Sequence, residues 1–256
     1  MGHGLTADER DAYRKHGFVM RPRALDAATV AGLRDAVEAI HVQISTHAPA
    51  SPEAERIDGL RFQQVLDSTV KWEWDEASPH IRSMEPFSHL DPRALAVLSD
   101  PRLTEPARDL LGEPICSFTD KLNFKRPGGS PFPWHQDTPY WAFGCDHADR
   151  LISVQVYLDD ATRENGCLWM IPGSHLHGAL PVFEDRGTIG RLYTDVDRFE
   201  GESPVAIEAP AGTAVFFHGD VVHGSQTNRT AESRRAVVLT YQPEGHPRWN
   251  RGEEAS

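Results

Sequence analysis

Two residues that can bind a metal ion, His135 and Asp137, are separated by one residue in a segment with a proline near each end, Pro133 and Pro139. Proline fixes its own φ angle and favours an extended conformation in the residue before it, so we expect this segment to be extended. In an extended chain, alternate side chains point to the same side. The imidazole of His135 and the carboxylate of Asp137 should therefore face one point, where a metal ion could bind.

A third ligand is available about 90 residues downstream, in the segment 218–225, which contains His218 and His223. Two histidines and one carboxylate form the protein face that holds non-haem Fe(II) and leaves other coordination positions open. Those positions suit O2 and a 2-oxo acid that binds through two oxygens. If that acid is 2-oxoglutarate, its far carboxylate needs a cation, and Arg234 or Arg235 could bind it with two parallel hydrogen bonds.

A histidine and an aspartate at this spacing also occur by chance in solvated surface loops. Here the pair lies among aromatic residues, namely Phe132, Trp134, Tyr140 and Trp141. Aromatic side chains are typical of the walls of a concave ligand site. We therefore interpret the pair as part of a binding pocket, which requires a fold that brings two distant segments of the chain together.

The first part of the chain has the patterns of helices. Residues that favour the first position of a helix precede four predicted helices. These residues are Thr6, Asp26, Asp91 and Asp100. Gly17 and Gly112 are suitable ends for the first and last of these helices. The segment 60–75 fits either a helix or a strand.

After Gly112 the sequence changes to short runs that are typical of strands, separated by turn residues. In the run 151–158, Ile152 and Val154 alternate with Ser153 and Gln155, so one face of this strand should be packed and the other polar. The predicted strands are 114–126, 151–158, 167–171, 206–209, 214–218, 221–226 and 236–242. Many short strands without helical periods predict a mainly β fold, either a barrel or a jelly roll.

A chain of 256 residues, of which 39% are hydrophobic, can form one large domain. We predict a single domain over 1–256, with a mainly helical part at 1–112 and a jelly-roll core at 113–245. The segment 176–202 has no clear periodicity and is long for a loop. Long loops in compact domains are often lids, so we predict a lid there.

The formal net charge is −12, which argues against nucleic acids and anionic membranes as partners. The three cysteines, Cys116, Cys145 and Cys167, are odd in number and far apart, which favours free thiols in a cytoplasmic protein. We see no signal peptide and no apolar run as long as a membrane span. The sequence leaves monomer and homodimer equally open.

Several segments together resemble one family, the phytanoyl-CoA dioxygenase-like branch of the Fe(II)/2-oxoglutarate oxygenases. The segment 5–41 resembles the family's N-terminal helices, and 133–137 its HxD metal motif. The run ENGCLWMIPGSH at 164–175 resembles a strand-turn segment of the family, and 212–225 its second histidine motif. The resemblance covers most of the chain and implies a cupin-like double-stranded β-helix, or jelly roll, with N-terminal helices packed around it.

The resemblance also implies the roles of individual residues. It selects His223 over His218 as the third iron ligand, beside His135 and Asp137. Family members that halogenate their substrates have Gly or Ala at the carboxylate position, so Asp137 favours hydroxylation.

For the co-substrate, the family's spacing selects Arg234 over Arg235 as the residue that holds the C5 carboxylate of 2-oxoglutarate. Ser225 is expected to assist Arg234. Asn123, on the strand before the metal segment, matches a position that often contacts the co-substrate.

The function implied is an oxygenase that uses Fe(II), 2-oxoglutarate and O2, hydroxylates a small organic molecule of natural-product or lipid type, and releases succinate and CO2. Epimerisation, desaturation and cyclisation remain open as outcomes. A metal-binding jelly roll that is a zinc cupin-like hydrolase, or has no activity, is the alternative. Arg234 and Ser225 argue against it, because a hydrolase does not need a clamp for a 2-oxo acid.

The substrate cannot be deduced from the sequence, because fold and metal site do not determine it. Trp141 and Phe143 follow the metal pair closely, and we treat both as candidate substrate contacts. Gln155 and His218 are further candidates. The pocket walls that come from 60–90 and 176–202 cannot be assigned from these patterns.

Overall fold

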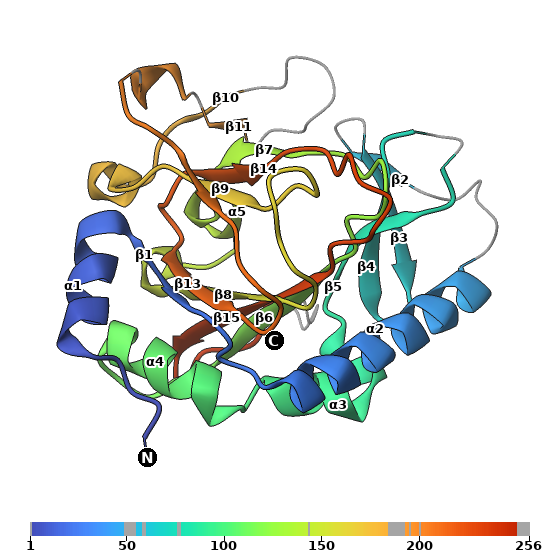
Figure 1. The fold of residues 1–256 in the computed structure, drawn as a ribbon, viewed down its shortest axis with the longest axis horizontal. Helices are drawn as coiled ribbons and strands as arrows, with labels where there is room; N and C mark the ends of the chain where they lie inside the picture. The colour runs from blue at the N-terminus through green and yellow to red at the C-terminus, as the bar shows by residue number, and fades with distance from the viewer. Residues whose placement is uncertain are drawn as a thin grey trace.

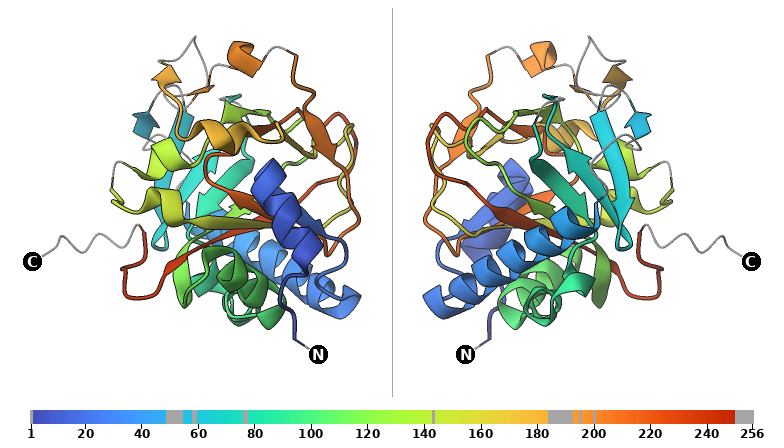
Figure 2. Two further views of the ribbon diagram at one scale, coloured as in Figure 1. Left: turned by 90° about the vertical axis from the view of Figure 1, so that its left-hand side faces the viewer. Right: turned by 90° about the vertical axis from the view of Figure 1, so that its right-hand side faces the viewer.

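The computed structural model describes residues 2–48, 55–57, 60–75, 78–142, 144–183, 193–194, 196–199 and 201–249. Over these residues the chain forms a large β sheet, a smaller sheet that lies across it, and helices on the outside of the large sheet (Figure 1). The side views in Figure 2 show the helices of the first half gathered on one side of the molecule.

The large sheet is antiparallel, and its strands lie in the order β1-β13-β8-β15-β6-β5-β4-β3-β2. Their bounds are β1 Phe18–Arg21, β2 Glu55–Ile57, β3 Leu60–Val65, β4 Ser68–Trp72, β5 Ile81–Glu85, β6 Ile115–Asn123, β8 Ile152–Tyr157, β13 Ala214–His218 and β15 Ala236–Pro243. β15 pairs with β6 on one side and with β8 on the other, so the last strand lies in the middle of the sheet.

The small sheet has the order β12-β9-β14-β7. Its strands are β7 Phe132–His135, β9 Leu168–Met170, β12 Val205–Ile207 and β14 His223–Ser225. A separate ladder joins β10 Val182–Phe183 to β11 Tyr193–Thr194. Two facing antiparallel sheets of this kind confirm the predicted jelly roll.

The helices begin and end where the capping residues predict. The α helices are α1 Ala7–His16, α2 Ala27–His47, α3 Pro92–Val97, α4 Pro101–Leu111 and α5 Thr138–Trp141, and the 3-10 helices are η1 Ser88–Leu90, η2 Ala148–Arg150, η3 Ser174–His177 and η4 Asp197–Phe199. At α1, the Glu9 amide donates to the Thr6 hydroxyl (3.2 Å) and the Thr6 amide donates to the Glu9 carboxylate (2.8 Å). Gly17 then ends α1 with a φ of 82°, which favours glycine.

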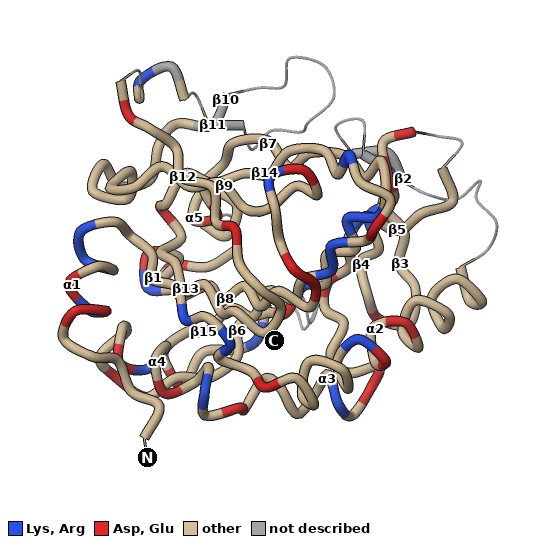
Figure 3. The backbone as a smooth tube through the Cα atoms, viewed as in Figure 1, with Lys and Arg blue, Asp and Glu red and all other residues tan. Residues whose placement is uncertain are grey.

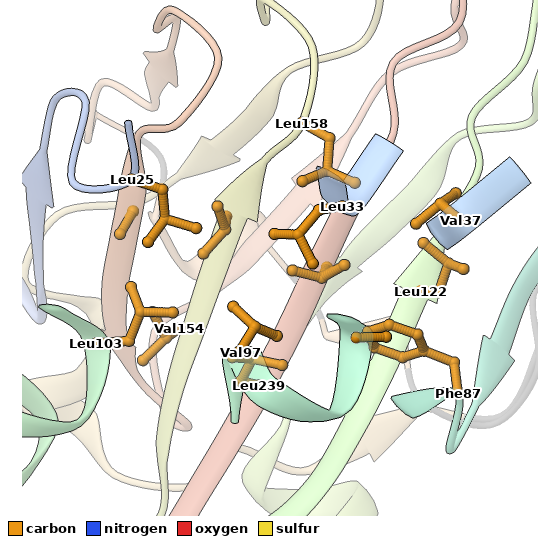
Figure 4. Close-up of a cluster of buried hydrophobic side chains, with 14 of the residues drawn as sticks. Leu25, Leu33, Val37, Phe87, Val97, Leu103, Leu122, Val154, Leu158 and Leu239 are labelled. Carbon is orange, nitrogen blue, oxygen red and sulfur yellow. The ribbon is translucent and has the colours of Figure 1, made fainter. Parts of the chain in front are cut away.

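The main core lies between the large sheet and the helices α2, α3 and α4. Leu33 and Val37 of α2 and Val97 of α3 pack toward Val154 of β8 and Leu239 of β15 (Figure 4). The predicted apolar face of 151–158 is therefore buried against helices. Because strand side chains alternate, the polar face of the same strand points to the opposite side, between the two sheets.

The first 112 residues are less uniformly helical than we predicted, because β1–β5 also belong to this part. The ambiguous segment 60–75 forms the hairpin β3–β4, and β5 joins this hairpin to β6. The first part thus extends the large sheet, which supports the prediction of one domain. These strands lack the apolar alternation by which a strand is recognised in a sequence, because their inward faces carry polar residues such as Lys71 and Glu85.

Much of the predicted lid, 176–202, lies outside the described residues. Its described portion includes Leu180 and Phe199, which pack with Ile171 and Val222 into a small apolar cluster. The lid itself stays a prediction. Among the helices of the described residues, none is long and apolar enough to cross a membrane.

Candidate active site

The metal-binding residues meet because two strands of the small sheet pair. In the ladder of β7 with β14, His135 lies directly opposite His223. Asp137 follows β7 and stands at the start of α5, where its backbone N–H donates to the carbonyl of Gly219 (2.9 Å). The 218–225 segment therefore supplies both a ligand and the contact that positions Asp137.

The three side chains converge on one point. Asp137 Oδ1 lies 3.8 Å from His135 Nε2 and 3.9 Å from His223 Nε2. The centroids of the two imidazole rings are 4.2 Å apart. One ligand atom from each residue lies within 4.8 Å of the others, which is the spacing expected around a single metal ion.

Hydrogen bonds fix which ring nitrogen faces the metal position. His135 Nδ1 lies 2.6 Å from the carbonyl of Pro133, and His223 Nδ1 lies 2.8 Å from that of Val221. A nitrogen beside a carbonyl oxygen must carry the proton and donate it, so Nε2 of each ring keeps a free lone pair. Burial, and then the neighbouring His223, lower the pKa of His135 to about 3, so this ring is neutral at neutral pH.

The pocket around these ligands is built from both sheets. The space between its walls measures about 510 Å³, counting the part open to solvent. The residues that line it are Lys121, Asn123, Phe132, His135, Asp137, Gln155, Leu168, Phe217, His223, Gly224, Ser225, Arg234 and Val238. All the predicted metal and co-substrate residues lie in this pocket, together with Gln155.

Arg234 is buried in this pocket, with 2% of its surface exposed. Its Nη2 donates to the carbonyl of Gly166 (2.6 Å), but its Nε has no hydrogen-bond partner among the described residues. Gly166 is required here, since its φ is +79° and a Cβ would lie 2.4 Å from the carbonyl oxygen of Gln226. Burial lowers the pKa of Arg234 from its usual value, because the charged guanidinium is disfavoured away from water. An anionic ligand would oppose this effect by stabilising the charged form.

Other polar atoms of the pocket also lack partners. Asn123 Oδ1 and Gln155 Nε2 are buried and form no hydrogen bond within the described part of the chain. A buried polar atom without a partner is costly, and such atoms usually mark a place where a ligand or water binds. Together with Arg234 Nε, they surround the metal position with unused hydrogen-bonding groups. The residues present therefore fit a metal ion and a polar, anionic co-substrate.

Two predicted substrate contacts, His218 and Trp141, are not among the residues that line this pocket, and their role stays a prediction. Phe217 faces the pocket, so its neighbour His218 on β13 points to the other side, where its Nδ1 accepts from the Asp220 amide (3.0 Å). Trp141 ends α5 and is buried in an apolar cluster with Phe118 and Leu151. Phe143 lies outside the described residues.

Sequence reasoning missed Lys121 and Phe217 as pocket residues, whereas Phe132 belongs to the aromatic group that it singled out. Lys121 could have been found, because it is two residues from Asn123 in a predicted strand and therefore lies on the same face. Ser153 was also missed, although it shares a face with Gln155. Its hydroxyl lies 3.4 Å from Asp137 Oδ2 and supports the carboxylate from the large sheet.

Comparisons with known proteins agree with this geometry. The family model described as Phytanoyl-CoA dioxygenase (PhyH) matches residues 13–236. A methylphosphonate hydroxylase of Gimesia maris is 30% identical over 241 residues, which cover 94% of this chain and 82% of that protein. An L-proline trans-4-hydroxylase of Streptomyces griseoviridis is 29% identical, covering 73% of this chain and 75% of that protein.

Among solved structures, EctD from S. alaskensis with 2-oxoglutarate and 5-hydroxyectoine superposes with a TM-score of 0.72 at 24% identity, covering 93% of this chain and 76% of that one. This likeness establishes a shared fold. Fold and metal-binding residues together define a jelly-roll protein of the non-haem iron class. The chain belongs to the phytanoyl-CoA dioxygenase family.

Proposed function

We propose that this protein is an Fe(II)- and 2-oxoglutarate-dependent oxygenase that hydroxylates a small organic molecule. His135, Asp137 and His223 would hold the iron. Arg234, with Ser225 and Asn123, would hold 2-oxoglutarate. When bound, the iron and 2-oxoglutarate together supply the activation of O2, with loss of CO2 and formation of succinate.

The observation that carries the proposal is the state of Arg234. Its guanidinium is buried in the same pocket as the metal ligands, and no carboxylate of the described residues lies within 4 Å of it. A buried charge without a counter-charge is strongly unfavourable. A dicarboxylic co-substrate removes this cost, because one end binds the metal and the other end pairs with Arg234.

The same observation argues against a zinc hydrolase of the cupin type. Such an enzyme needs a metal and an activated water, and it has no use for a buried cation beside the metal. The apolar side chains of Leu168, Phe217 and Val238 also line the pocket. They make part of the wall around the metal position apolar, which suits a reaction that must avoid side reactions with solvent.

We further propose a small-molecule substrate and a cytoplasmic location, with neither nucleic acid nor membrane as a partner. The two named relatives act on methylphosphonate and L-proline, which are small. The net charge of −12 disfavours phosphate-rich partners. The three cysteines carry free thiols, which is typical of a reducing compartment.

Anaerobic titration and turnover measurements test the function. The metal-free protein should bind about one Fe(II) per chain, and 2-oxoglutarate should bind tightly only after iron has bound. Admission of O2 should then produce succinate, faster with substrate present. A protein that binds zinc but gains no affinity for 2-oxoglutarate with any metal would be a hydrolase or a silent binder instead.

A further inference from the structure

One wall next to the metal site carries a set of buried and partly buried polar side chains, contributed by β4, β5 and β6. Cross-strand pairing places Lys71 opposite Ser83, and Ser83 opposite Asn123. Side chains of residues in register point to the same face. Since Asn123 and Lys121 line the metal pocket, Lys71 and Ser83 belong to the same wall. The backbone view in Figure 3 shows basic positions gathered around β4 and β5.

The cations of this wall exceed its anions. Lys121 Nζ lies 3.8 Å from Glu85, which is itself buried and accepts a hydrogen bond from Thr119 (2.7 Å). Lys71 Nζ has no carboxylate within 4 Å among the described residues. It lies instead over the aromatic rings of Phe62 (5.4 Å) and Tyr140 (5.7 Å). One carboxylate thus faces two ammonium groups.

The nearby Arg82 does not share this role. Its Nη2 donates to the carbonyl of Pro131 (2.6 Å), and its guanidinium lies over the ring of Phe132 (4.0 Å). The register between β4 and β5 shifts beside Arg82, and Phe132 also lines the metal pocket, so this guanidinium lies at the edge of the same pocket. Glu73 is the acidic group that acts on Arg82 and opposes its charge. Burial is the main cause that lowers the pKa of Lys71 to about 8, and the charges of Lys121 and Arg82 act in the same direction.

Iron and co-substrate leave the excess charge in place. Bound Fe(II) with the Asp137 carboxylate, the two carboxylates of 2-oxoglutarate and Arg234 would sum to zero. Lys71, Lys121 and Glu85 would then keep a net charge of about +1 in a partly buried wall, and an anion would offset this charge. The hydroxyl of Ser83 is buried and has no hydrogen-bond partner among the described residues, so a hydrogen-bonding group is available beside the two lysines.

We propose that Lys71 and Lys121, with the Ser83 hydroxyl, form a subsite for an oxyanion of the primary substrate. The chemical class is a small molecule with a carboxylate, phosphonate or sulfonate group. The acidic group docks on β4–β6 and the rest of the molecule extends toward the metal ligands. This inference rests on the proposed function, and it selects one substrate class within it.

Two ammonium groups with a hydroxyl fit an oxyanion well, because each ammonium offers strong, charge-assisted hydrogen bonds. Glu85 holds Lys121 in place and limits the net charge, so the subsite favours a single acidic group. Methylphosphonate and L-proline, the substrates in the names of the two relatives, both carry such a group.

The test compares acidic probes with neutral counterparts, of which propionate and propionamide also match closely in shape. Methylphosphonate is paired with its dimethyl ester, and propionate is paired with propionamide. Each probe is titrated by calorimetry into the anaerobic protein loaded with Fe(II) and 2-oxoglutarate. The acidic member of at least one pair should bind roughly tenfold or more tightly than the neutral member, since a hydrogen bond to a charged group contributes substantially to affinity.

Variants then assign the binding to the proposed residues. Lys71→Met should weaken the acidic probe roughly 10- to 100-fold and leave the neutral probe and 2-oxoglutarate unchanged. Lys71→Arg should keep most of the affinity, which also shows that the site still folds. Lys121→Met should weaken the acidic probe to a similar extent. The exposed Lys15 provides the matched control, and Lys15→Met should change nothing.

Three outcomes would overturn the inference. They are equal binding of acidic and neutral probes, an acidic preference that survives in Lys71→Met and Lys121→Met, and a loss of 2-oxoglutarate affinity in Lys71→Met. The last outcome would assign Lys71 to the co-substrate. Failure of the wild-type protein to bind Fe(II) and 2-oxoglutarate would be recorded before any probe is added, and it would reject the proposed function itself.

Discussion

Arg234 and Arg235 are neighbours in the sequence, yet their side chains lie on opposite sides of the large sheet. Arg234 lines the metal pocket with no carboxylate within 4 Å among the described residues. Arg235 points outward and is paired with Asp159 (2.7 Å) and with Glu38 of α2 (2.9 Å). Of these two arginines, only Arg234 has a charge that is not already paired with a carboxylate of the described residues, so it can bind an anionic ligand.

Arg234→Ala should weaken 2-oxoglutarate binding by roughly 10²–10³-fold. Removal of one partner from a buried ion pair typically costs about 3–5 kcal/mol, and about 1.4 kcal/mol corresponds to a factor of ten in affinity. Arg234→Lys should recover only part of the loss, because an ammonium cannot form the two parallel bonds of a guanidinium. Titration of 2-oxoglutarate into the Fe(II)-loaded variants measures both effects.

Arg235→Ala is the matched control for this experiment. It removes surface ion pairs and should lower stability, while 2-oxoglutarate affinity stays close to that of the wild type. If Arg235→Ala takes the large loss of affinity and Arg234→Ala does not, the assignment of the two arginines is reversed. If neither variant loses affinity, the protein does not use 2-oxoglutarate in the way we propose.

The metal ligands can be tested against a nearby histidine that is not one. His135→Ala, Asp137→Ala and His223→Ala should each lower the iron content of the purified protein strongly and abolish succinate formation. His218→Ala should retain iron, because His218 lies on the outer face of β13. Metal analysis after Fe(II) reconstitution gives the result. Normal iron content in His223→Ala together with loss in His218→Ala would show that the wrong histidine was chosen.

Gln136, between the two ligands of the HxD motif, points away from the metal and ties the metal segment to the start of the predicted lid. Its Nε2 donates to the carbonyls of Asp220 (2.7 Å) and Gly178 (3.0 Å), and its Oε1 accepts from the Leu180 amide (2.7 Å). Gln136→Ala leaves these backbone groups unpaired and should cost on the order of 3 kcal/mol.

Urea denaturation measures the lost stability of Gln136→Ala, and hydrogen exchange should show faster exchange of the Leu180 amide. The exposed Gln64 provides a control, and Gln64→Ala should change neither quantity.

In the wild type, the lid prediction requires exchange in the described part of 176–202 to slow when substrate binds. Equal and strong protection with and without substrate would make this segment ordinary scaffold.

Glu9 gives a prediction for pH. Its hydrogen bonds to Arg21 are the main reason that its pKa falls to about 2, and Thr6 contributes as well. Since the pKa is lower in the folded state than the ordinary value of 4.5, Glu9 stabilises the fold fully above that value. The contribution is lost as the pH falls from about 4.5 toward 2.

Glu9→Gln should therefore lower the free energy of unfolding by about 1–2 kcal/mol near neutral pH, through the loss of the cap and of the ion pair. The difference from the wild type should shrink as the pH is lowered below about 4.5. Urea denaturation at several pH values checks this, with the exposed Asp8→Asn as control. A difference that is constant with pH would mean that Glu9 is not paired as the structure shows.

Local patterns in the sequence determined most of the framework. Helix starts at Thr6, Asp26, Asp91 and Asp100 follow from side-chain capping, which acts over three or four residues and needs no tertiary contact. Alternation in 151–158 predicted which face of β8 is packed. The family motifs then predicted His135, Asp137, His223 and Arg234, and the structure places all four in one pocket.

What only the tertiary structure decided involves contacts between residues far apart in the chain. The pairing of His135 with His223 and the pocket wall from β4, β5 and β6 depend on which strands lie side by side. A strand with polar residues on an inward face, such as Lys71 on β4, shows no apolar pattern and cannot be recognised locally. For the same reason the sequence could not show that Trp141 packs in an apolar cluster with Phe118 and Leu151. Sequence patterns reflect local conformational preferences, whereas the wall built by β4, β5 and β6 depends on how strands far apart in the chain pair.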